Sequence, residues 1–169
     1  MGRISADIVN ALLEPVPSAL RAWIGVDRSP AKVDLVSELP PPPGIMVTIE
    51  LKGGLVGTIT WNFEQPVARQ IALTMLPGAI SDDEICPGAC ADAVAELANI
   101  IAGNASGVLA AAGYPVEIMP PQTWVRDQAS PLSEKTLSFT FATPLGRMTM
   151  LICVQPGPAV RGAQPFRAR

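Results

Sequence analysis

The sequence predicts an α+β fold, in which an antiparallel sheet built from hairpins packs against long helices. Two observations support this: β-rich runs occur in pairs separated by turn residues, and apolar residues recur at helical spacing in other segments. At 169 residues the chain is most simply one domain, which we place over residues 1–154. Residues 155–169, rich in Pro, Gly, Ala and Arg, are expected to form a flexible tail.

The first predicted element is an amphipathic helix over residues 4–24. Apolar residues recur every four positions along its first half, and Ser5 can cap its start. Pro15 and Pro17 are poor residues for a helix interior, so we expect a kink or a break there.

A β-hairpin is predicted next, after a rigid proline run at residues 40–44. Residues 45–52 and 55–63 are rich in β-branched and aromatic side chains, which favour strands. Gly53-Gly54 between the two runs is a turn signal, so the runs should pair as antiparallel neighbours.

Two helices should follow this hairpin. Residues 65–76 show helical apolar spacing and are stopped by Pro77-Gly78. The longest predicted helix covers about residues 84–112 and ends at Gly113. Acidic residues stand at its start, where the helix dipole favours them.

The last predicted elements are strands. Residues 116–119 form a short strand, and residues 134–142 and 145–154 form a second hairpin. The strands of this second hairpin are also candidate sheet edges, through which two copies of the chain could form a homodimer.

Composition excludes several classes of function. The net charge is −3 and no long basic stretch occurs, so nucleic acid is not an expected partner. The chain contains no histidine, which removes the commonest general base and the commonest zinc ligand. No secretory signal and no uninterrupted apolar run of membrane-spanning length is present, so we expect a cytoplasmic protein that does not enter the membrane.

Several residues are predicted to be buried rather than functional. The three cysteines are too few for a zinc site without histidine, so we expect buried, reduced thiols and no metal site: Cys86, Cys90 and Cys153. The three tryptophans should lie in the core: Trp23, Trp61 and Trp124. Asn104 falls near the apolar side of the longest helix and is predicted to be a hydrogen-bonded core amide.

The opposite side of the longest helix is the candidate functional surface. At about 100° per residue, one arc is apolar and should face the core: Val94, Leu97, Ile100, Ile101 and Val108. The other side is polar or small: Asp92, Glu96, Asn99, Gly103 and Ser106. Glu96 and Asn99 are three apart, so their side chains should lie next to each other. Taken alone, such a pair is common on solvated helix faces.

The surroundings of this pair resemble a known family. Residues 53–59 resemble the strand with a "GG-x-x-G" motif that opens the CheX-like domain. Residues 92–103 resemble the family motif of Asp or Ser, then Glu-x-x-Asn, then a small Ala-Gly pair, and Pro120-Pro121 resembles the proline after the next strand. Over residues 4–154 the chain therefore resembles the CheC/CheX/FliY family and is most similar to CheX-like domains, which implies a CheC-like fold.

The resemblance implies a phosphatase that hydrolyses the aspartyl phosphate of a CheY-like receiver domain. Asn99 would orient the attacking water, and Glu96 would pair with the receiver's active-site lysine. Asp92 and Gly103 would belong to the surface that contacts the receiver. Mg²⁺ would be held by the receiver, so no cofactor is expected in this chain. Such chemistry needs mainly positioning and electrostatics, which fits a chain without histidine.

Three alternatives remain at this point. The first is a non-catalytic adaptor of the same fold that binds receivers without hydrolysing them, and the second is an interaction module for an unrelated partner. Retention of both Glu96 and Asn99 favours catalysis. The third concerns a second site, which some relatives carry. Asp7 and Asn10 on the first helix have the same spacing of three as Glu96 and Asn99. They are either a degenerate second site or polar residues that serve helix capping and packing.

Overall fold

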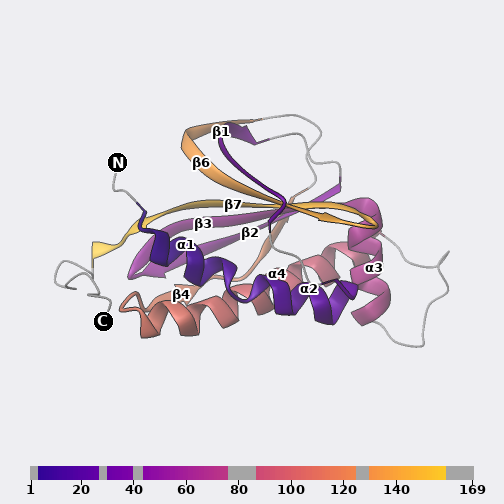
Figure 1. Ribbon diagram of the computed structural model, residues 1–169, viewed down its shortest axis with the longest axis horizontal. Coiled ribbons are helices and arrows are strands. Elements are labelled where there is room, and N and C mark those ends of the chain that lie inside the picture. The colour runs from indigo at the N-terminus through magenta and orange to yellow at the C-terminus, as the bar shows by residue number, and fades with distance from the viewer. Residues whose placement is uncertain (1–3, 27–29, 40–43, 76–86, 125–129, 159–169) are drawn as a thin grey trace.

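The computed structural model describes residues 4–26, 30–39, 44–75, 87–124 and 130–158. Within these residues, antiparallel strands form one seven-stranded sheet, and the helices cover one face of it (Figure 1). The helices are α1 (Ala6–Leu13), α2 (Val16–Ile24), α3 (Gln65–Met75) and α4 (Pro87–Ala111). The strands are β1 (Lys32–Leu39), β2 (Gly44–Gly53), β3 (Leu55–Glu64), β4 (Val116–Ile118), β5 (Gln122–Trp124), β6 (Ser130–Thr143) and β7 (Gly146–Pro156). The predicted α+β class is confirmed.

The two predicted hairpins form the centre of the sheet. The strand order is β1-β6-β7-β3-β2-β4, and β5 pairs with the other half of β2. The hairpins β2–β3 and β6–β7 join through β3 and β7. The prediction that residues 134–154 supply a sheet edge is wrong, because β6 and β7 each pair on both sides. The edges are β1 on one side and β4 with β5 on the other.

The predicted break in the first helix is confirmed. α1 begins after Ser5, whose Oγ accepts a hydrogen bond from the Ile8 N–H at 3.4 Å. It ends at Leu13, and α2 begins at Val16, so the two helices are separate. Pro17 lies in the first turn of α2, where the N–H that proline lacks would have no helical partner.

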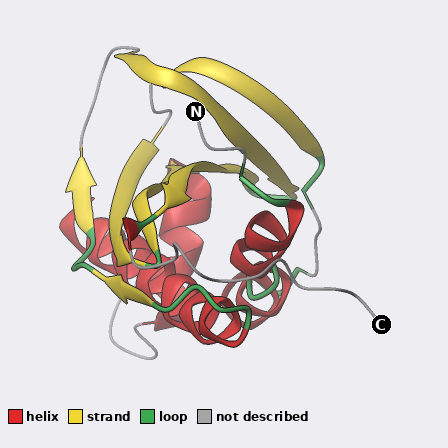
Figure 2. Ribbon diagram, turned by 90° about the vertical axis from the view of Figure 1, so that its left-hand side faces the viewer, coloured by secondary structure: helices red, strands yellow, loops and turns green. Residues whose placement is uncertain are grey.

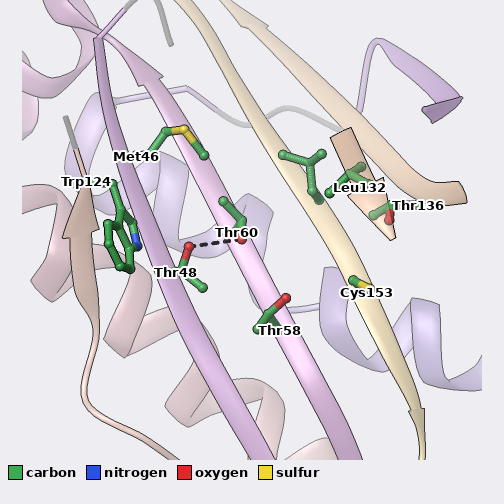
Figure 3. Close-up of a pocket in the computed structure, with 9 residues that line it drawn as sticks. Met46, Thr48, Thr58, Thr60, Trp124, Leu132, Thr136 and Cys153 are labelled. Atoms are coloured by element: carbon green, nitrogen blue, oxygen red, sulfur yellow. Dashed lines mark hydrogen bonds between the residues drawn. The ribbon is translucent and has the colours of Figure 1, made fainter. Parts of the chain in front are cut away.

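The hydrophobic core lies between the sheet and the helices. Trp61 is 1% exposed, and its ring centroid lies 5.9 Å from that of Phe63 and 6.0 Å from that of Phe141. Trp23 packs half-buried against the same core. The prediction of a buried Trp124 is wrong: this side chain is 47% exposed. It belongs to the three-residue edge strand β5 and lies on the helix-free face of the sheet, away from the helices (Figure 3).

The last glycine of the "GG-x-x-G" motif allows two central strands to approach closely. Gly57 has a φ of +137°, a region that side chains other than glycine rarely adopt. A Cβ at this position would overlap the backbone carbonyl oxygen of Cys153 on β7. The motif therefore has a structural function in the sheet, at the pairing of β3 with β7.

α4 is long and apolar enough to cross a membrane when judged by length and composition alone. Its 25 residues include an 18-residue window with a mean hydropathy of 1.3. This differs from the expectation that no segment of the chain has the apolar length needed to cross a membrane. In the structure α4 packs against the sheet and against α1, α2 and α3, as a core helix of this length and composition does.

The sheet continues past the expected start of the tail. β7 runs to Pro156, so Gln155 and Pro156 belong to it. The Gly157 N–H then donates a hydrogen bond of 2.9 Å to the Gly54 carbonyl at the β2–β3 turn. Residues 159–169 lie outside the described part of the chain.

An ion pair joins the end of β3 to the start of β7. The Arg147 N–H donates to Glu64 Oε2 at 2.9 Å, and Arg147 Nε donates to Glu64 Oε1 at 2.8 Å. Both hydrogen bonds hold the pKa of Glu64 below its ordinary value of 4.5, and the bond from the Arg147 backbone has the larger effect. The folded chain therefore binds the proton of this carboxyl group less tightly than the unfolded chain.

We predict that Glu64→Gln lowers the free energy of unfolding at pH 7 by about 1 kcal/mol, because the pair is partly exposed. Since the folded-state pKa is depressed, the stabilisation is complete above pH 4.5 and is lost as the pH falls through the folded-state pKa. Urea denaturation of wild type and variant between pH 7 and about pH 3 measures the difference. Glu117→Gln, an exposed glutamate on the edge strand β4, is the control. A wild-type advantage that persists unchanged in acid would contradict this account.

Candidate functional site

The position of α4 is set by its buried side. The buried residues are apolar or small: Cys90, Ala93, Val94, Leu97, Ala98, Ile101, Ala102, Ala105 and Leu109. They face α1, α3 and β2, against which α4 packs. Of the predicted apolar arc, Val94, Leu97 and Ile101 are buried, whereas Ile100 and Val108 are only half-buried. Burial of this side points the opposite side of the helix outward.

The predicted polar surface faces outward. Asp92, Glu96 and Gly103 are exposed, and Asn99 is half-exposed. None of the Asp92, Glu96 and Asn99 side chains forms a hydrogen bond or ion pair with another described residue. Their polar groups are therefore available to a partner. We call the surface formed by Asp92, Glu96, Asn99 and Gly103 the α4 polar face.

The small residues near this face divide into two groups. Ala98 and Ala102 are buried, so they serve the packing of α4 within the molecule rather than an approach by a partner. Gly103 is exposed, and a Cβ built on it would meet nothing within 4 Å. The next turn beyond Asn99 thus presents bare helix backbone, over which another surface could pass closely.

The prediction of a buried Asn104 is wrong, because this residue is exposed. The buried arc rotates along the helix: Ala93 and Leu97 are buried in the first half, and Ala102, Ala105 and Leu109 in the second. At about 100° per residue, Asn104 lies between Ala93 and Leu97 in the first arc but outside the second. The prediction assumed that the same side of the helix is buried along its whole length, so it missed this rotation.

The residues of the suggested second site are also on the surface. Asp7 and Asn10 are both exposed on α1, which packs against α4 (Figure 1). Asp7 lies in the first helical turn, where a carboxylate is favoured by the helix dipole. The helix ends at Leu13, one turn after Asn10, so the second pair occupies a much shorter element than α4.

The described cysteines, Cys90 and Cys153, do not form disulfide bonds. Cys90 is buried and Cys153 is half-buried, while Cys86 lies outside the described residues. Among the described residues, no three Cys, Asp or Glu side chains are grouped as a metal site would require. The described part of the chain thus offers no ligand set of its own for a metal ion.

A groove on the helix-free face of the sheet was not predicted. It has a volume of about 440 Å³ and is lined by Met46, Thr48, Thr58, Thr60, Trp124, Leu132, Thr136, Leu151 and Cys153 (Figure 3). Polar residues at alternate positions were the signal that could have indicated a polar sheet face: Thr48 and Glu50 on β2, and Thr58, Thr60 and Asn62 on β3. The groove and the α4 polar face lie on opposite sides of the sheet.

Comparison with known proteins gives consistent results. The family model described as "Chemotaxis phosphatase CheX" matches residues 45–142. The CheY-P phosphatase CheX of Thermotoga maritima is 29% identical over 120 residues, which cover 70% of this chain and 75% of that protein.

Solved structures share the fold. The crystal structure of a chemotaxis protein CheX from Desulfovibrio desulfuricans has a TM-score of 0.75 at 19% identity, covering 88% of this chain and 99% of that one. A structure of the CheX–CheY–BeF3–Mg²⁺ complex from Borrelia burgdorferi has a TM-score of 0.62 at 24% identity, covering 90% and 99% of the two chains.

We predict that the α4 polar face contributes little to stability. Glu96→Ala should change the free energy of unfolding by no more than about 0.5 kcal/mol, and Asn99→Ala should be neutral or slightly stabilising, since Ala is the better helix former. Leu97→Ala, on the buried side, should cost about 2–5 kcal/mol. Urea denaturation measures all three. A large loss for Asn99→Ala would show that its side chain holds the fold together.

Proposed function

Because the chain belongs to the CheX chemotaxis phosphatase family, we propose that it hydrolyses the aspartyl phosphate of a CheY-like receiver domain. The observation that carries the proposal is the outward-facing pair of exposed Glu96 and half-exposed Asn99 on one face of α4, whose side chains have no partners among the described residues. A complex between a CheX and a CheY exists among the proteins of similar fold, which supports a receiver as the partner. A cytoplasmic location, where receivers occur, is part of this proposal.

The proposed function of Asn99 is to orient the water that attacks the phosphoryl group. A carboxamide has both a donor and an acceptor, so it can hold a water in line with the bond that breaks. It does not need to accept a proton, because an aspartyl phosphate is already labile and the receiver supplies the stabilising charges. Mg²⁺ would be bound by the receiver, and this chain would bring no cofactor.

The other residues of the α4 polar face would hold the receiver in place. Glu96 would pair with the active-site lysine of the receiver, and this contact fixes the position of Asn99 one turn away. Asp92, one turn before Glu96, would contact the receiver at its periphery. Gly103 would allow the receiver to approach the helix backbone closely.

Two further features belong to this proposal. Asp7 and Asn10 on α1 would at most form a degenerate second site, and the full Glu-x-x-Asn motif is on α4.

A homodimer would use β1 rather than residues 134–154, because β1 is a sheet edge on which Val33 and Leu35 are 56% and 59% exposed. The molar mass of the chain in solution, measured by light scattering, tests the dimer.

We predict that Asn99→Ala lowers the rate of phosphate release from a phosphorylated receiver by about a hundredfold, because the attacking water loses its position. A phosphate-release assay with the receiver alone as baseline measures it. Asn104→Ala, an exposed asparagine on the same helix but off the α4 polar face, is the matched control and should retain the wild-type rate.

Asn10→Ala tests the second site and should also retain most of the wild-type rate of phosphate release.

We predict that Glu96→Ala raises the KM for the receiver more than it lowers kcat, since it removes a docking contact. If Asn99→Ala hydrolyses at the wild-type rate, the residue assignment fails. If wild type adds nothing to self-hydrolysis of receivers to which it binds, the adaptor alternative is correct.

We predict that bulk at position 103 blocks the receiver without harming the fold. Gly103→Met places a long side chain in open space, so the free energy of unfolding should stay equal or rise, while the KM for the receiver rises by about tenfold or more. Asn104→Met adds the same side chain one residue away and should leave KM unchanged. Equal effects of the two variants would mean that the receiver does not dock on the α4 polar face.

A further inference from the structure

The helix-free face of the sheet carries a polar pattern that the phosphatase proposal does not use. Side chains alternate along each strand, so Thr58, Thr60 and Asn62 of β3 point away from the helices, whereas Trp61 and Phe63 point toward them. Thr60 pairs with Thr48 on β2 and with Leu151 on β7. The same side of β7 carries Cys153 (Figure 3).

The buried polar residues of the described chain gather on this face. They are Thr60, Asn62, Thr136 and Ser138, exposed by 7%, 6%, 3% and 6%. In register, Ser138 pairs with Leu151, which pairs with Thr60, so these residues lie across neighbouring strands. Of these four residues, Thr60 and Thr136 line the groove, so part of the buried polar surface of this face lies within it.

Hydrogen-bonding capacity remains unused on this face. The Asn62 Oδ1 atom is buried and has no hydrogen-bond partner. Thr48 Oγ1 and Thr60 Oγ1 bond to each other at 3.1 Å, which uses one of their two hydrogens and leaves further acceptor lone pairs. Asn62 is not among the residues that line the groove, whereas Thr48 and Thr60 are, so a ligand in the groove would find its hydrogen-bonding partners in these two hydroxyl groups.

The shape of the groove fits a small molecule. Its volume of about 440 Å³ lies in the range typical of small-molecule sites. β3 and β7 form its floor, while Trp124 and Met46 on one side face Leu132 and Thr136 on the other (Figure 3). The latter two belong to β6, which rises with β1 above the helix-free face of the sheet (Figures 1 and 2). This ribbon makes the face concave, which suits a compact ligand better than the flat face of another sheet.

The chemistry of the lining indicates the class of ligand. The described lining residues are apolar, hydroxyl-bearing or a thiol, and none is charged. A charged ligand would lose its hydration there without gaining an opposite charge. We propose that this groove binds an uncharged, amphipathic small molecule, with an apolar body between Trp124 and Leu132 and at least one hydrogen-bonding group directed to the Thr48–Thr60 pair.

A matched pair of dyes tests the proposal on the full-length chain. N-phenylnaphthylamine is uncharged, with two apolar ring systems and one N–H donor, and anilinonaphthalene sulfonate adds an anionic group to the same framework. We expect saturable binding of the uncharged dye, with energy transfer from the exposed Trp124 at the groove, and at least about tenfold weaker binding of the anionic dye. Trp124→Phe should lower the energy transfer, because it removes the donor that lines the groove, and should also weaken binding, because it removes part of the apolar wall.

Substitutions separate the groove from other apolar surfaces. Cys153→Phe fills the groove and should weaken binding of the uncharged dye by about tenfold or more, whereas Leu145→Phe adds the same ring to an exposed turn outside it and should have no effect. Thr60→Val keeps the shape and removes a hydroxyl group, so it should weaken binding about threefold or more. The exposed patch on β1 is controlled by Val33→Ser with Leu35→Ser, which should not change binding.

Three results would overturn the proposal. The first is equal binding of both dyes, which would indicate a general apolar surface. The second is binding that is lost in the β1 double variant and kept in Cys153→Phe. The third is no binding of the uncharged dye together with a change of molar mass in Cys153→Phe, which would show that a second copy of the chain occupies the groove. None of these readouts uses phosphatase activity.

Discussion

The fold depends above all on how α4 is buried. This helix packs against the sheet and against the other helices of the described residues, and alanines on its buried side allow these elements to come close. An α-helix is rigid at the scale of one turn, so fixing Leu97 and Ile101 inward also fixes Glu96 and Asn99 outward. A pair of side chains that must enter another protein's active site is thereby held on a rigid element rather than on a loop.

The two faces of the sheet have different chemistry because only one is covered by helices. The covered face carries large apolar residues such as Trp61 and Phe63, while the free face carries threonine, serine and asparagine. Threonine suits such a face because its β-branched side chain favours the strand conformation and its hydroxyl group can form hydrogen bonds with water. Several of these polar groups are nevertheless buried, although the described helices lie on the other face of the sheet (Figure 1).

Much of the fold could be predicted because its signals are local. The hairpins follow from Gly53-Gly54 and from the alternation of flanking residues, and the break between α1 and α2 follows from Pro15 and Pro17. β1 was missed because its residues carry charged side chains and its partner, β6, is distant in sequence. The outward direction of Glu96 and Asn99 followed from helical periodicity, whereas Asn104 and Trp124 depended on which neighbours cover them.

The pairing of β1 with β6 has a consequence for the order of assembly. Lys32 pairs with Thr140, so this contact joins positions that are far apart in the sequence. Closing so long a loop costs chain entropy that only a preformed sheet can offset, so we infer that β1 is added last. During synthesis on the ribosome, the segment with Val33 and Leu35 would wait for the last hairpin to emerge. The charged neighbours Lys32 and Asp34 would then protect an unpaired strand from association with other nascent chains.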